Sequence, residues 1–135
     1  MRTIQITSFG YGHAPAPEAN IVLDVRRALH DPHFDPAMRE LTARDERVLD
    51  HVAATPGAAE LLDYLADLAH TLGRHTRTDQ PGPAVTIAIG CTGGRHRAPA
   101  LAQLAIDRIC ALGWHVEVIN RDIDKSVIGH RPTEN

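Results

Sequence analysis

The sequence has few aromatic residues, which make up 4% of its 135 residues. Its interior must therefore depend on Ala, Leu, Val and Ile. It also has only two cysteines, Cys91 and Cys110, and they do not form a C-x-x-C pair. This scarcity argues against a disulfide framework and favours a reducing compartment.

Long hydrophobic runs are also missing. No apolar run approaches the length of a transmembrane helix, and the N-terminal segment "MRTIQITSFGYGH" lacks the apolar core of a signal peptide. We therefore expect a cytoplasmic protein with no membrane partner. The formal net charge of −3 argues against a surface that attracts nucleic acid everywhere, although a local basic patch is compatible with it.

Lysine is nearly absent, because Lys125 is the only lysine among the 14 basic residues and all the others are arginine. Arginine suits planar, bidentate contacts to phosphate, although a high Arg and Ala content can also reflect base composition. No G-x-x-x-x-G-K-[ST] motif occurs, so we expect no Walker-type ATPase site. No two of the nine histidines have the spacing of metal ligands on one helix, and we expect neither a metal nor a cofactor.

The apolar pattern predicts a single α/β domain over residues 1–135. Four strands are expected, at residues 2–9, 20–26, 84–90 and 114–120. The continuous apolar run in 20–26 favours a strand that is buried on both faces. We expect the tail 126–135 to be flexible or loosely packed.

Three segments have helical periodicity. Residues 36–56 predict one or two short helices, and Thr42 with Asp45 is a candidate cap for the second. The clearest helix spans 57–75, with four leucines on its expected buried face: Leu61, Leu65, Leu68 and Leu72. Residues 99–113 predict a third helix, with a buried stripe of Leu101, Leu104, Ala105, Ile109 and Leu112.

The order of strand 84–90, helix 99–113 and strand 114–120 predicts a right-handed β-α-β unit with parallel strands. The fold is therefore expected to be a mostly parallel sheet of about four strands, flanked by helices. The loop that follows strand 84–90 then lies at the carboxyl edge of the sheet, where open α/β sheets bind ligands.

That loop has the sequence "CTGGRHR" at residues 91–97. The amides of Gly93, Gly94, Arg95 and His96 can converge on one anion at the start of a helix. The Thr92 hydroxyl can add a hydrogen bond and Arg97 a bidentate contact, while Arg95 and His96 close over the ligand or face solvent. An ordinary tight turn with solvated charges is the alternative. We expect Arg97 to anchor the ligand and its removal to leave the fold nearly intact.

The spacing from Cys91 to Arg97 is also that of the cysteine phosphatases, C-x5-R. A helix N-terminus and nearby arginines would lower the pKa of a nucleophilic thiol. However, Ala98 stands where these enzymes usually have Ser or Thr, and spacing does not identify a general acid. A phosphatase that uses Cys91 and Arg97 therefore remains an alternative to a non-catalytic site.

Several motifs in order resemble the C-terminal domain of the RNase adapter protein RapZ, of the YvcJ-type nucleotide-binding family. "IAIGCTGGRHR" at 87–97 is similar to the family signature "AIGCTGG(K/R)HR". Four further segments also match: "SFGYGHAP" (8–15), "LDVR" (23–26) with "DPHFDP" (31–36), "RELTARD" (39–45) and "NRDIDK" (120–125). Family members usually carry an N-terminal P-loop kinase-like domain. The sequence shows no such half, so we expect a stand-alone domain without nucleotide hydrolysis.

The resemblance implies a sensor of a phosphosugar, glucosamine-6-phosphate, with a further role in binding small RNAs. Thr92, Gly93, Gly94 and Arg97 match the family's anion-binding motif. Asp24, Arg26 and His33 match other pocket positions, although Asp24 and Arg26 could simply form an ion pair and His33 could cap a turn. Ala43 and Asn120 replace a Gly and a His of the family, so the resemblance does not determine which sugar is bound.

We therefore expect a non-catalytic binding domain for a phosphorylated metabolite, with an RNA- or protein-binding adapter as the alternative. The net charge and the missing half make RNA delivery the weaker expectation. We also expect a homo-oligomer, because Trp114 and the Val127-Ile128 pair look exposed and the resemblance points the same way.

Overall fold

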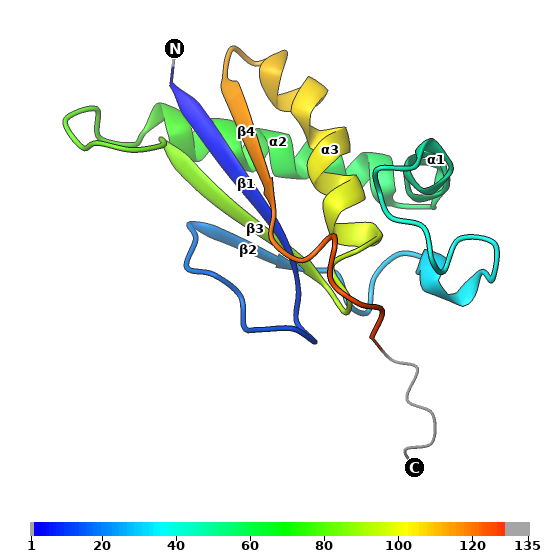
Figure 1. Ribbon diagram of the computed structural model, residues 1–135. Helices are drawn as coiled ribbons and strands as arrows, with labels where there is room; N and C mark the ends of the chain where they lie inside the picture. The colour runs from blue at the N-terminus through cyan, green and yellow to red at the C-terminus, as the bar shows by residue number, and fades with distance from the viewer. Residues whose placement is uncertain (1, 129–135) are drawn as a thin grey trace.

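The four strands form one all-parallel sheet in the computed structural model, which describes residues 2–128 (Figure 1). The strands are β1 (Thr3–Gly10), β2 (Ile21–Asp24), β3 (Val85–Cys91) and β4 (His115–Asn120). Their order across the sheet is β2-β3-β1-β4, so β1 and β3 are central. The register pairs Gly10 with Cys91, which brings the ends of the two central strands together at one edge.

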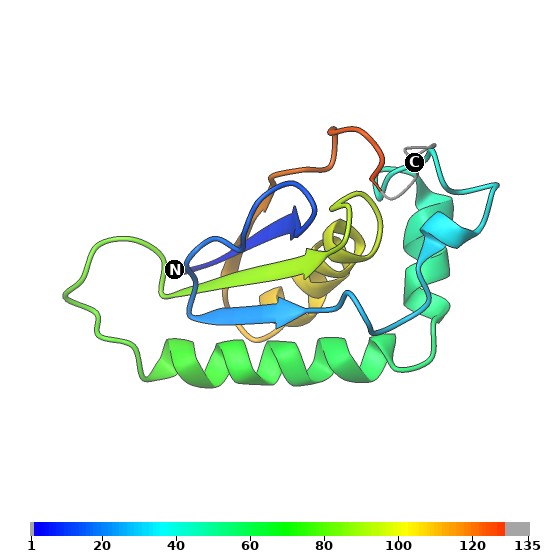
Figure 2. The ribbon, with the colours of Figure 1, turned by 90° about the horizontal axis from the view of Figure 1, so that it is seen from below.

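Three α-helices accompany the sheet: α1 (Glu46–Ala54), α2 (Ala58–Arg74) and α3 (Arg97–Cys110). Helix α3 packs on β1, β3 and β4, and α2 passes beneath the sheet on the side of β2 and β3 (Figure 2). The side chains of Ile4, Ile6 and Ile87 face the helices and are fully or almost fully buried. The other face of the sheet carries polar side chains such as Gln5, which donates to Glu117 at 3.5 Å. The predicted fold class is therefore confirmed.

The second strand is shorter and more exposed than expected. Residues 20–26 predict a strand buried on both faces, but β2 has four residues and lies at the edge of the sheet. Val22 remains 48% exposed because only one face of the sheet is covered. The prediction of a doubly buried strand is therefore wrong.

The helix expected over 36–56 is also shorter, because only Glu46–Ala54 is helical. Asp45 caps it by accepting a hydrogen bond from the Arg47 amide at 2.9 Å, which fixes where the helix begins. Thr42 is not the cap; its hydroxyl accepts from the Arg44 amide within the preceding turn. Residues before Asp45 form turns and the one-turn 3-10 helix η1 (Pro32–Phe34).

Helix α2 buries a different face from the one its leucines predict. Its buried residues are Ala58, Leu62, Leu65, Ala66, Ala69 and Gly73. Small side chains allow the helix to approach its neighbours closely, and the Trp114 ring occupies the space beside Gly73. Leu68 and Leu72 are consequently 49% and 38% exposed. The helix predicted over 99–113 begins two residues earlier, at Arg97, and Leu112 lies beyond its end and is partly exposed.

Candidate functional site

The loop between β3 and α3 lies at the carboxyl edge of the sheet. Its position is fixed by a close contact between two backbones: a Cβ on Gly10 would lie 2.4 Å from the carbonyl carbon of Gly93. Gly94 has a φ of 75°, and a Cβ there would meet the Gly10 amide at 2.7 Å. Only glycine fits both positions, so the loop is held against the end of β1.

Most backbone amides of this loop donate to no acceptor in the described part of the chain. They belong to Thr92, Gly93, Arg95, His96 and Arg97. The two exceptions, the amides of Gly94 and Ala98, donate to Cys91 Sγ at 3.3 and 3.4 Å. Because these amides stand at the N-terminus of the 14-residue helix α3, the helix dipole adds partial positive charge. The loop therefore offers donors and a field that suit an anion.

A cavity of about 170 Å³ opens beside this loop. Its walls come from the loop, from residues 31–34, and from Val127 and Ile128. A neighbouring cavity of about 300 Å³ shares Asp31, Thr92 and Arg97 with it and extends to Arg26. The two spaces together can hold a small anionic group with a larger organic part beside it.

Cys91 lies at the bottom of the loop with 3% of its surface exposed. Burial raises the pKa of its thiol above the ordinary value, and the two amide hydrogen bonds offset this only in part. The sulfur is therefore a neutral acceptor that shapes the loop, whereas a phosphatase nucleophile needs a thiolate at neutral pH.

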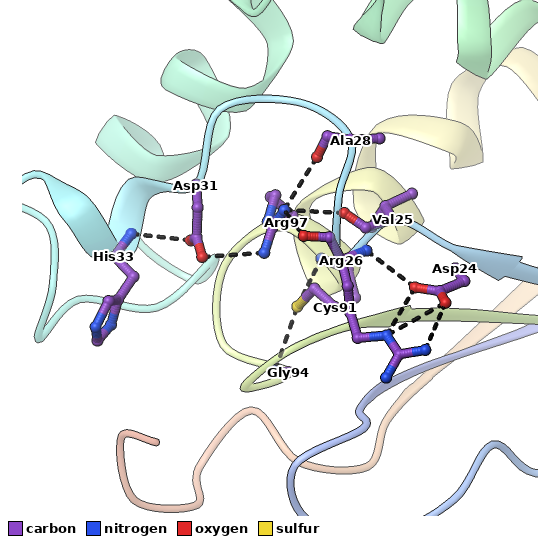
Figure 3. Close-up of polar contacts among 10 residues, drawn as sticks. Asp24, Val25, Arg26, Ala28, Asp31, His33, Cys91, Gly94 and Arg97 are labelled. Atoms are coloured by element: carbon purple, nitrogen blue, oxygen red, sulfur yellow. Dashed lines mark hydrogen bonds and ion pairs between the residues drawn. The ribbon is translucent and has the colours of Figure 1, made fainter. Parts of the chain in front are cut away.

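Arg97 is turned away from the loop and is 3% exposed (Figure 3). Its Nη1 donates to the carbonyls of Val25, Arg26 and Ala28 at 2.9, 3.0 and 3.0 Å. Its Nη2 donates to Asp31 Oδ2 at 3.0 Å. The premise that Arg97 is a loop-end side chain with little structural role is wrong, because its guanidinium is buried and joins the 25–31 segment to α3. Whether Arg97 also contacts a ligand stays a prediction.

Arg95 and His96 likewise bind the chain around the loop. Arg95 donates to the carbonyls of Lys125 and Glu40 at 2.7 and 3.0 Å. The His96 Nε2 lies 3.1 Å from the Met38 carbonyl, and burial lowers the pKa of its ring. A neutral imidazole with the proton on Nε2 satisfies that carbonyl. Both side chains still line the cavity, so a role in closing over a ligand stays a prediction.

Two of the three residues suggested by the family pattern line the cavities. His33 lines the smaller cavity, and Arg26 lines the larger one. Asp24 lines neither. Its carboxylate accepts from Arg26 Nε and Nη2 at 3.0 and 2.7 Å, which also lowers the pKa of Asp24 (Figure 3). The Arg26 guanidinium in turn lies 3.8 Å from the centre of the Tyr11 ring.

The family model described as the RapZ C-terminal domain matches residues 2–124. The chain belongs to this family.

Similar proteins include a nucleotide-binding protein of Thermobifida fusca, 37% identical over 127 residues, and one of Frankia casuarinae, 38% identical over 120 residues. A third, from Rhodospirillum centenum, is 40% identical over 121 residues. Each alignment covers 89% of this chain but only 40%, 41% and 36% of the respective relative. The chain thus spans about two fifths of the length of these relatives.

Two aspartates hold the chain around this loop of the RapZ C-terminal domain; Asp31 was not singled out from the sequence, whereas Asp122 was expected, with Arg121, to fix the end of a strand to the rest of the domain. Asp31 holds Arg97, and its other oxygen accepts from the His33 amide at 3.0 Å. Asp122 is fully buried and accepts from the Gly10 amide at 2.8 Å. Burial raises the pKa of Asp122, but hydrogen bonds from Arg121, Lys125 and Gly10 outweigh it and lower the pKa to about 2. The segment "NRDIDK", which contains Asp122, pointed to this residue because the segment matches the family pattern.

The surfaces first expected to drive self-association are used within the chain. Trp114 Nε1 donates to His70 Nδ1 at 2.9 Å, and its ring packs on Gly73. Val127 and Ile128 line the smaller cavity. These residues therefore do not supply the exposed apolar surface that the sequence suggested. The rest of the predicted flexible tail, beyond Ile128, lies outside the described residues.

No group of three or more His, Cys, Asp or Glu side chains within residues 2–128 is arranged to hold a metal ion. Over the same range, no helix combines the length and the apolar character of a membrane span.

Proposed function

We propose that this domain binds the phosphate group of a phosphorylated metabolite on the loop of residues 92–97, without cleaving it. The observation that carries the proposal is the set of loop amides that donate to no acceptor within residues 2–128. Amides that converge at a helix N-terminus bind anions through hydrogen bonds and through the helix dipole.

The organic part of the ligand would extend into the larger cavity. A phosphosugar fits this arrangement, since Arg26, Asp31 and the exposed Thr92 border that space with groups that bond to hydroxyls. The family resemblance makes glucosamine-6-phosphate the first ligand to test. A nucleotide is the second, because the relatives are named nucleotide-binding proteins and nucleotides carry the same phosphate chemistry.

Two features favour binding over phosphatase chemistry. Burial raises the pKa of Cys91, so the nucleophilic thiolate is scarce at neutral pH. The Arg97 guanidinium, which a phosphatase would direct at the transferred phosphate, instead bonds to three carbonyls and Asp31. The site therefore has the donors for holding phosphate and lacks an activated nucleophile.

An RNA-binding role has less support. Most arginines of the described chain pair with aspartates: Arg26, Arg44, Arg47, Arg77, Arg97, Arg108 and Arg121. Paired guanidiniums contribute less to the positive field that attracts a polyanion.

The test is calorimetric titration of glucosamine-6-phosphate, other sugar phosphates and nucleotides into the wild type, Gly93→Asp and Thr78→Asp. A Cβ on Gly93 would meet no atom within 4 Å, so aspartate fits there and puts a carboxylate beside the amides. Thr78→Asp adds the same charge at an exposed position in the loop before β3 and serves as the control.

We expect Gly93→Asp to weaken phosphate-ligand binding by at least about tenfold, and Thr78→Asp to leave it within about twofold. We also expect no release of inorganic phosphate. Equal affinity in all three folded proteins would overturn the proposed site, and phosphate release that Cys91→Ser abolishes would establish the phosphatase instead.

A further inference from the structure

An exposed aromatic ring lies beside the proposed phosphate site. Phe34 is 71% exposed, the highest value among the exposed large apolar side chains of residues 2–128. It lines both the smaller cavity next to the loop and the larger neighbouring cavity. A single exposed apolar side chain is ordinary on a protein surface, but aromatic side chains that line a cavity are typical contacts of a small-molecule ligand.

The backbone that carries Phe34 is held in place from two sides. Asp31 caps the short helix η1, because its Oδ1 accepts from the His33 amide at 3.0 Å and its carbonyl accepts from the Phe34 amide at 3.1 Å. The Oδ2 of Asp31 accepts from Arg97 at 3.0 Å, which ties η1 to the start of α3 (Figure 3). Arg39 Nε donates to the His33 carbonyl at 2.8 Å. The backbone under Phe34 is therefore fixed relative to the loop before a ligand binds, which lowers the entropic cost of binding.

The position of Phe34 determines which part of a ligand it can touch. The smaller cavity is lined by Phe34 and by the loop residues Thr92 and Gly93, so a phosphate on the loop would bring the group bonded to it next to the aromatic ring. The face of an aromatic ring is negative and attracts C–H groups, which carry partial positive charge. A sugar ring presents several C–H groups on one rigid face. An open chain has to lose conformational entropy to present the same surface.

We infer that Phe34 is a specificity-determining residue, which packs on the face of a sugar ring and favours cyclic sugar phosphates over open-chain polyol phosphates of the same charge. The inference rests on the proposed function, because the phosphate must occupy the loop for the ring to reach Phe34. Inorganic phosphate has no ring, so its binding should not depend on Phe34. Because the side chain is mostly exposed, its replacement should change stability little.

Titrations followed by amide NMR test the role of Phe34, because they also measure weak binding. The ligands are glucose 6-phosphate and glucosamine-6-phosphate, the open-chain alditol phosphate of each, and inorganic phosphate. We expect the wild type to bind the tighter of the two hexose phosphates about three- to tenfold better than its alditol. Phe34→Ala should lose this difference and keep its affinity for inorganic phosphate within about twofold.

Two further variants serve as controls. Phe34→Trp keeps an aromatic face at the same position and should retain the preference for the ring. Tyr64→Ala removes an aromatic side chain that is 64% exposed on α2 and lines neither cavity, so it should bind every ligand as the wild type does. Circular dichroism verifies that each variant is folded.

Failure of this inference can be distinguished from failure of the proposed function. A wild type that binds each hexose phosphate no better than its alditol overturns the role of Phe34, as does a Phe34→Ala variant that keeps the preference. If Gly93→Asp weakens the binding of inorganic phosphate in either case, the loop site stands without the selection by Phe34. If Gly93→Asp leaves that binding unchanged, or if no phosphate compound binds, the proposed site fails and the inference fails with it.

Discussion

Two arginine–aspartate pairs have different physical roles, although the arginines of both line the larger cavity. Arg97 and Asp31 form a pair whose side chains are 4% and 17% exposed, and the arginine also bonds to three carbonyls. Arg26 and Asp24 form a pair at 2.7 Å whose side chains are 46% and 43% exposed. The buried pair of Arg97 and Asp31 therefore fixes the backbone around it. The solvated pair of Arg26 and Asp24 only orients the Arg26 side chain near the surface.

The strongest test of this difference is to remove each arginine in turn. Arg97→Ala leaves Asp31 and three carbonyls without their donor, so we expect a loss of about 3–5 kcal/mol of stability. Arg26→Ala should cost less than about 1 kcal/mol, because water replaces the lost contacts. Urea unfolding of both variants measures the difference. Equal losses would show that burial of the Arg97 pair does not matter.

Most of the fold of this domain could be predicted from the sequence, because the β-strands and the β-α-β unit have strong apolar patterns. The position of the loop between β3 and α3 could also be predicted, since glycines after a strand and before a helix are a local signal. The orientation of the Arg97 side chain could not be predicted, because its hydrogen-bond partners at Val25, Ala28 and Asp31 are far away in the sequence. The buried face of α2 does not follow from its leucines, because three alanines and a glycine are buried beside Leu62 and Leu65.

Acid should distinguish Asp122 from the solvated Asp24. The pKa of Asp122 is about 2 in the folded chain and 3.8 as its ordinary value. Because the folded value is lower, its stabilisation is present above about pH 4 and is lost as the pH falls toward 2, with a size of about 2 kcal/mol.

Urea unfolding at a series of pH values measures this loss. Asp122→Asn should make stability depend less steeply on pH in this window, while Asp24→Asn should change the slope little because its ion pair is solvent-screened. Unchanged slopes in both variants would show that Asp122 is not a source of the acid sensitivity.

The smallest effects are expected from neutralising the two carboxylates. In Asp31→Asn, the amide oxygen can still accept from Arg97, but the charge is lost, so we expect a cost of about 1–2 kcal/mol. Asp24→Asn should cost a few tenths of a kcal/mol, at about the level of an exposed pair. Thermal unfolding at neutral pH compares the two. A larger loss of stability for Asp24→Asn than for Asp31→Asn would contradict the structural role given to the Arg97–Asp31 pair.

We propose that the backbone amides of the loop bind the phosphate. The most direct measurement is the amide NMR spectrum of ¹⁵N-labelled protein during titration with glucosamine-6-phosphate and, separately, inorganic phosphate. We expect the largest amide shifts at the residues whose amides have no acceptor within residues 2–128: Thr92, Gly93, Arg95, His96 and Arg97. Gly94 and Ala98, whose amides donate to Cys91 Sγ, should shift less. Saturable shifts centred elsewhere, or none in this loop, would contradict it.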